Sequence, residues 1–161
     1  HVYDIDQDTG GQYAFRKDLP LPLPIPQGIR AAFPLEGYAG RIACVVTPDV
    51  FKRPEGYVTI LHEFVHCFQF ETCEQQLKMS LDVARKALEV GDFMWEIEHP
   101  FPYQALDFIR SYQRFLSAIA EKSTRDVLLA RQDLRTFLGV HDFEYLVWQE
   151  WKEVFARWVE N

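Results

Sequence analysis

The sequence is poor in cysteine and contains no long apolar run, and both absences exclude classes of protein. The three cysteines, Cys44, Cys67 and Cys73, cannot all pair within the chain, and none belongs to a CxxC arrangement. We therefore expect neither a disulfide scaffold nor a redox pair, and reduced thiols slightly favour the cytoplasm. No stretch approaches the roughly 20 apolar residues of a membrane span, so we expect a soluble protein. Because the sequence begins with His1 rather than Met, a leader can precede it, and the compartment stays open.

Positive charge is too sparse and too dispersed for nucleic acid to be a partner. The 161 residues include 17 Lys and Arg against 24 Asp and Glu, which gives a net charge of −7. No basic cluster is dense enough to neutralise a phosphate backbone. With 48% hydrophobic residues, the chain can bury one compact core but is too short for two ordinary domains. We expect a single domain over residues 1–161, and the sequence does not indicate its oligomeric state.

The first 40 residues are predicted to be largely extended. Residues 19–26 alternate Leu or Ile with Pro, a pattern that can form neither a helix nor a central strand. This run could be a polyproline ligand for a partner protein. The interpretation that we favour is a stiff strap that packs its Leu side chains on the domain.

A short strand followed by several helices is predicted for the rest of the chain. Residues 41–47 are apolar and β-branched, which is typical of a buried strand. Apolar residues then recur at helical spacing, which predicts a buried helix from near Tyr57 to about Phe70. Four further helices are expected over about 80–90, 103–122, 124–138 and 142–160, with caps at Ser80, Ser123 and Asp142 and stops at Gly91 and Gly139. The predicted fold class is α+β and predominantly helical: a small N-terminal strand region, one long helix and a bundle of about four more.

The most informative motif is His-Glu-Phe-Val-His at residues 62–66. On a helix, His62 and His66 lie about 40° apart around the axis, so both imidazoles project to one side and can share one metal ion. Two His and one carboxylate suit a catalytic Zn²⁺ that keeps a position for water. Glu63 would take the proton from this zinc-bound water, which attacks a carbonyl, and pass it to the leaving group. The pattern also arises by chance, but here it follows a buried strand and lies within an amphipathic helix.

The third ligand is expected to be a glutamate from a later helix. Gln69 and Thr72 stand where a metzincin would have Gly and His, so the motif is not of that kind. The glutamates that could complete the site are Glu89, Glu96, Glu98, Glu150 and Glu153. Cys67 faces away from His66 by about 100° on a helix, which favours a buried free thiol over a fourth ligand.

Residues 151–160 read Trp-Lys-Glu-Val-Phe-Ala-Arg-Trp-Val-Glu, and this segment resembles the Asn-Glu-Gly-Phe-Ala-x-Tyr-x-Glu segment of the gluzincin peptidases, which have a zincin-like fold. In those enzymes the first Glu of the segment binds zinc, so the resemblance implies that Glu153 is the ligand. The sequence departs from the family at Lys152 and Val154, and an insertion of helices must separate the two motifs. Glu150 is the second choice for the ligand. The alternative for Glu153 is a surface ion pair with Arg157, four residues later.

Two residues are candidates to stabilise the oxyanion that forms during amide hydrolysis. His99 and Tyr103 lie in a proline-bounded segment, where a donor can be held at the wall of a cleft. A packed aromatic turn explains the same pattern slightly better. His141 and Asp142 receive no catalytic role, because Asp142 is more simply an N-cap.

These patterns together favour a zinc metallopeptidase that acts on a peptide or protein substrate. The first rival is a zincin-like domain that binds metal but is catalytically inactive and serves as a binding or structural module of a larger protein. The second rival is a metal-dependent hydrolase of a non-peptide substrate, because the same site can serve a differently shaped pocket.

Overall fold

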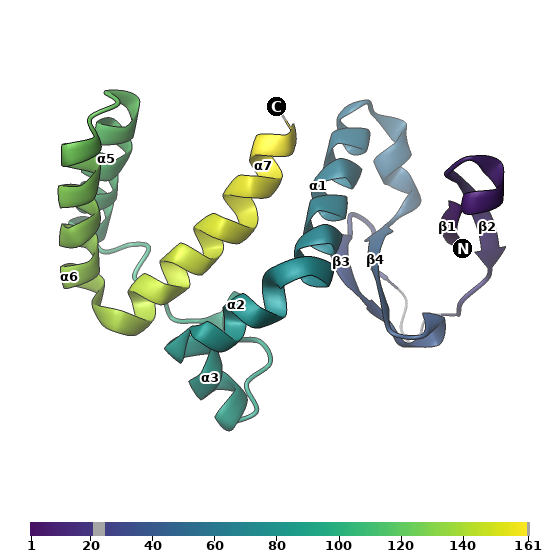
Figure 1. The fold of residues 1–161 in the computed structure, drawn as a ribbon, viewed down its shortest axis with the longest axis horizontal. Helices are drawn as coiled ribbons and strands as arrows, with labels where there is room; N and C mark the ends of the chain where they lie inside the picture. The colour runs from purple at the N-terminus through teal and green to yellow at the C-terminus, as the bar shows by residue number, and fades with distance from the viewer. Residues whose placement is uncertain (21–24, 161) are drawn as a thin grey trace. The chain divides into compact units, whose positions relative to one another are not determined.

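The protein is mostly helical and carries two small antiparallel sheets (Figure 1), which confirms the predicted α+β, predominantly helical class. The structure is a computed structural model that describes residues 1–20 and 25–160. Residues 21–24, the centre of the predicted proline-rich strap, lie outside this range. No helix in the described ranges is long and apolar enough to cross a membrane.

Each sheet is a hairpin of two strands. β1 (Val2–Asp6) pairs with β2 (Gln12–Lys17), and β3 (Arg30–Leu35) pairs with β4 (Arg41–Val46). β4 is the strand that the apolar, β-branched run predicted. It leads through a short 3₁₀ segment, η3 (Pro48–Lys52), to the long helix α1 (Glu55–Gln69).

α1 ends at Gln69, which confirms the predicted end near Phe70. The helical backbone then continues through a π-helical segment, η4 (Phe70–Glu74), directly into α2 (Gln75–Ser80). Ser80 is therefore the last residue of α2 rather than the cap of α3 (Asp82–Glu89), whose N-cap position is Leu81. The prediction of a cap at Ser80 was wrong because η4 leads into a further helix.

The remaining predicted helices are present with shifted ends. A short helix, α4 (Trp95–Glu98), precedes α5 (Leu106–Ala120), and α6 (Thr124–Gln149) follows. Ser123 caps α6 by accepting a hydrogen bond from the Asp126 amide, as expected, and Gly139 interrupts α6 at a φ of 72°. The chain ends with a π-helical segment, η5 (Glu150–Val154), and α7 (Phe155–Glu160). Asp142 is not an N-cap, because the two residues before it are already helical.

The described chain divides into two compact units. The first contains residues 1–71 and the final turns from residue 156 onward, and in it α1 packs against β3, β4 and η3. The second contains residues 72–155, and in it α6 packs against α5 (Figure 1) and α3. Aromatic and aliphatic side chains form the core of this unit. Buried residues at the centre of this core include Trp95, Phe101, Leu134, Tyr145 and Trp148. The single domain over residues 1–161 stays a prediction.

The start of α1 depends on a close contact that only glycine allows. A Cβ atom at Gly56 would lie 1.7 Å from the carbonyl oxygen of Val50 in η3. Gly→Ala within a helix normally stabilises by about 1 kcal/mol, but here we expect Gly56→Ala to destabilise the protein by about 1–3 kcal/mol, as overpacking does. Thermal unfolding of Gly56→Ala beside Val58→Ala, a more exposed site on the same helix, measures the effect. A raised melting temperature for Gly56→Ala would contradict the close contact.

An ion pair between Arg30 and Asp49 links β3 to η3 and makes the stability of the protein depend on pH in the acid range. Asp49 accepts hydrogen bonds from Thr47 Oγ1 (2.5 Å) and Arg30 Nη2 (2.6 Å). The Thr47 hydroxyl and then the Arg30 guanidinium lower the pKa of Asp49 to about 2. Because this folded-state pKa lies below the value of about 3.9 in an unfolded chain, the stabilisation is complete above about pH 4 and is lost as the pH falls towards 2.

We therefore expect Asp49→Asn to lower the free energy of unfolding at pH 7 and to reduce its loss between pH 4 and pH 2.5. Urea unfolding at several pH values measures both effects. Asp107→Asn, at a side chain that is 75% exposed, serves as the control. An unchanged pH dependence in Asp49→Asn would show that Asp49 does not contribute to the acid sensitivity.

Candidate metal centre

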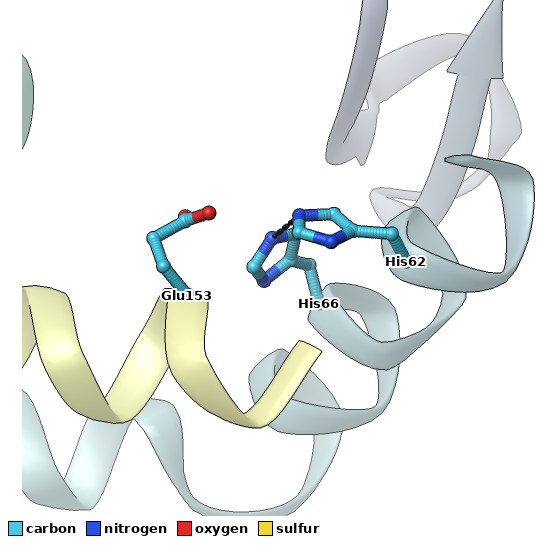
Figure 2. A group of neighbouring side chains, drawn as sticks. All are labelled: His62, His66 and Glu153. Atoms are coloured by element: carbon cyan, nitrogen blue, oxygen red, sulfur yellow. Dashed lines mark hydrogen bonds between the residues drawn. The ribbon is translucent and has the colours of Figure 1, made fainter. Parts of the chain in front are cut away.

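The two histidines of the motif project from the same side of α1, as their spacing predicted. Their Nε2 atoms lie 2.9 Å apart and their ring centroids 4.6 Å apart (Figure 2). His66 is buried, and the side chain of His62 is 12% exposed. Both nitrogens that could bind one ion therefore meet at a site that is largely shielded from water.

The outer nitrogen of each ring lies close to an oxygen atom within the first unit. His66 Nδ1 lies 2.9 Å from Gln69 Oε1, and His62 Nδ1 lies 3.1 Å from Glu160 Oε1. The two Nε2 atoms form a hydrogen bond with each other, in which one ring donates a proton and the other accepts it. Metal-binding histidines in proteins are oriented by the same kind of outer partner.

The two Nε2 atoms are 2.9 Å apart, a distance at which one ring donates a hydrogen bond to the other. A shared proton satisfies the pair, and so does a metal ion that takes one lone pair from each ring. The donor set of two neutral imidazoles fits zinc better than calcium or magnesium, which prefer oxygen ligands. The geometry of His62 and His66 is thus suited to a zinc ion.

Glu153 completes a group of three potential ligands. Among the residues that the structure describes, His62, His66 and Glu153 form the one group of three whose ligand atoms all lie within 4.8 Å of one another (Figure 2). Glu153 lies in η5, which continues into α7, and Glu160 follows it after seven residues, or about two helical turns. Both glutamates therefore lie on one stripe of the helix whose end contacts His62 through Glu160.

The other glutamates that were considered as ligands have different surroundings. Glu150 forms a bidentate pair with Arg131 and accepts a hydrogen bond from Tyr112. Burial of Tyr112 and the negative charge of Glu150 raise the pKa of this tyrosine to about 12. Glu96 binds Lys78 and Lys152. Glu89 and Glu98 are exposed. The second choice, Glu150, is thus committed to an arginine and is outside the group that could hold a metal.

Charges on both sides of Glu153 fix the π-helical segment η5. On one side Glu150 is held by Arg131, and on the other Lys152 lies 3.1 Å from Glu96 and 3.7 Å from Glu74. These ion pairs are partly or fully buried, so breaking one would leave an uncompensated charge. The segment that presents Glu153 is therefore anchored within the second unit.

Glu63 is buried beside two thiols. Its side chain is 7% exposed, and its charge contributes to the raised pKa values of Cys44 and Cys67. Burial is the main cause, and it raises the pKa of Cys44 to about 12 and that of Cys67 to about 11. Both thiols are protonated at neutral pH, and Cys67 is free, as predicted, but it is partly rather than fully buried.

The proposed oxyanion donors belong to the second unit and have partners there. His99 Nε2 lies 2.8 Å from Asp142 Oδ1, and the His99 ring stacks on Tyr145 at 4.4 Å. Tyr103 is 53% exposed, and its ring packs on Phe101 at 4.6 Å. This arrangement is the packed aromatic turn that was the alternative, and it shows why Asp142 is an acceptor for His99 rather than a cap.

Sequence reasoning missed the two acceptors that orient the histidines. Gln69 lies three residues after His66 on the same helix, so helical spacing could have identified it. Glu160 could not be found in this way, because nothing in the sequence relates the last helix to His62.

The chain matches no protein-family model, and neither the curated proteins nor the solved structures include a significant match to it.

Proposed function

We propose that the protein is a zinc-dependent hydrolase, a metallopeptidase of the gluzincin type with a zincin-like fold. The observation that carries the proposal is the convergence of His62 Nε2 and His66 Nε2 on one side of α1, at a site largely shielded from water. Glu153 is the third ligand in this proposal.

Each residue of the proposed site has a separate role in amide hydrolysis. His62, His66 and Glu153 would hold a zinc ion, which would lower the pKa of bound water towards neutrality and polarise a carbonyl oxygen. Glu63 accepts the proton from water as oxygen adds to the amide carbon, and donates it to the nitrogen when the C–N bond breaks. Gln69 and Glu160 lie beside the outer nitrogens of the two rings and would orient them around the metal. His99 and Tyr103 have no part in this proposal.

The proposal is tested first by the metal content of the purified chain. We expect about one zinc per chain, and Co²⁺ in its place should give the intense visible absorption of a tetrahedral site. Cleavage is then assayed with a library of fluorogenic peptides. A chain that takes up no zinc from a micromolar supply would refute the proposal, and zinc without any cleavage would favour the inactive binding module.

The third ligand is tested by comparing glutamates of the same helical run. We expect Glu153→Gln to weaken zinc binding by more than the roughly 10- to 100-fold loss that an outer partner causes, whereas Glu160→Gln should fall within that range. Glu150→Gln, which breaks the pair with Arg131, serves as the control for general damage to η5. Competition with a fluorescent chelator measures each affinity. An unchanged affinity in Glu153→Gln, with Arg157→Ala lowering stability, would instead support the surface ion pair.

A further inference from the structure

A second surface, independent of the zinc proposal, lies where α3 ends and α4 begins. Five apolar side chains are exposed within ten residues, with exposed fractions of 47–79%: Leu88, Val90, Phe93, Met94 and Ile97. Large apolar side chains that gather on one surface usually mark a site of interaction, whereas scattered ones do not. We call these five residues, with the carboxylates of Glu89, Asp92 and Glu98 among them, the 88–98 surface.

The backbone of the 88–98 surface is fixed by hydrogen bonds. α3 ends in a Schellman motif in which the Gly91 amide donates to Leu88 and the Asp92 amide donates to Ala87, with Gly91 at a φ of 72°. The Asp92 carboxylate then accepts a hydrogen bond from the Met94 amide (2.9 Å). The apolar side chains are therefore exposed on an ordered turn.

Two buried side chains attach this turn to the core of the second unit. Trp95 is 7% exposed and packs against Tyr145 and Trp148. The Glu96 carboxylate accepts from Lys78 at 2.6 Å and from Trp148 Nε1 at 2.9 Å. Because Trp95 and Glu96 point inward, Phe93 and Ile97 are held outward, with exposed fractions of 79% and 76%. An anchored turn with large outward side chains loses little conformational entropy on binding.

Charge identifies the kind of partner. Residues 87–109 contain five acidic residues and no Lys or Arg. Glu96 is paired inward, but Glu89, Asp92 and Glu98 are exposed, and none has a cationic partner in the described part of the chain. An anionic membrane would be repelled, and a second copy in a two-fold contact would bring these carboxylates against their equivalents. A cationic segment that carries apolar side chains complements both features.

We propose that the 88–98 surface is a docking site for a basic, amphipathic peptide segment of a partner protein. Phe93 and Ile97 enter the apolar face of the partner, and Glu89 and Glu98 pair with its Lys or Arg side chains. Large, firmly held apolar side chains at the centre of an interface usually carry most of the binding energy, and rim charges set orientation and salt dependence.

The test is fluorescence anisotropy of the full chain with a fluorescein-labelled, 14-residue Leu/Lys peptide, and with the same peptide in which Glu replaces each Lys. We expect saturable binding of the Lys peptide and none of the Glu peptide. Phe93→Ser/Ile97→Ser and Glu89→Lys/Glu98→Lys should each weaken binding by at least about tenfold, or ~1.4 kcal/mol. The matched control, Leu128→Ser/Leu129→Ser, alters two exposed leucines of α6 and should leave the affinity unchanged within about twofold, the usual result away from a hot spot.

Three results would overturn this inference. The Lys peptide could fail to bind, or it could bind all variants with equal affinity. Light scattering could also show that the chain dimerises, with Phe93→Ser/Ile97→Ser restoring the monomer, in which case a second copy occupies the surface. Because the exchanged side chains are exposed, circular dichroism of each variant should match that of the parent.

Discussion

His66→Ala is expected to abolish zinc binding, with a loss of affinity of at least about a thousandfold. The buried His66 supplies one of two imidazole nitrogens, and a site that loses one of them keeps only His62 and a carboxylate, which bind zinc weakly in water. Isothermal titration with zinc measures the loss. The matched control is His141→Ala, because His141 pairs with Asp82 on the second unit and takes no part in the site.

A loss of zinc could also follow from a loss of fold, so stability must be measured in parallel. His66→Ala leaves a small cavity and deprives Gln69 of its partner, which should cost about 2–4 kcal/mol. Zinc should raise the melting temperature of the parent chain, since an ion that binds only the folded state stabilises it by mass action. The folded His66→Ala chain should show no such rise. Equal zinc-dependent stabilisation of both chains would exclude this histidine as a ligand.

The elements that could be predicted from the sequence are those that local chemistry determines. The β-branched run predicted β4, the apolar spacing predicted α1, and Ser123 and Gly139 marked the start and the interruption of α6. The helical continuation after α1 could not be predicted in the same way. η4 carries the backbone on into α2 through a π-helical turn, and Glu74 in this turn is buried against Lys78.

The candidate site likewise contains some residues that local sequence predicts and others that it does not. His62, Glu63 and His66 follow from a five-residue motif on one helix, and Gln69 was within reach of the same reasoning. Glu150 and Glu153 could not be separated by sequence, because they lie one turn apart and have similar local spacing. They are distinguished by the ion pair of Glu150 with Arg131, 19 residues earlier in the chain, and by the grouping of Glu153 with the two histidines. Glu160 could not be predicted from local spacing, because it contacts His62, which lies nearly a hundred residues earlier in the chain.

Glu63→Gln is expected to separate catalysis from metal binding. The amide keeps the size and the hydrogen-bonding atoms of the buried carboxylate but cannot accept a proton at neutral pH, so kcat should fall by about 10²–10⁴, the usual contribution of a general base. Zinc affinity should stay within about threefold of the parent value, because Glu63 is not one of the three grouped ligands. The control is Glu71→Gln, an exposed glutamate two helical turns further along the chain.

Each result of this comparison has a distinct meaning for the protein. Lost turnover with retained zinc assigns Glu63 as the base and distinguishes an enzyme from a metal-binding module. Equal turnover in Glu63→Gln and Glu71→Gln would mean that water is activated elsewhere, and the hydrolase mechanism proposed for this site would be wrong. Lost zinc in Glu63→Gln would show that this buried side chain supports the site structurally.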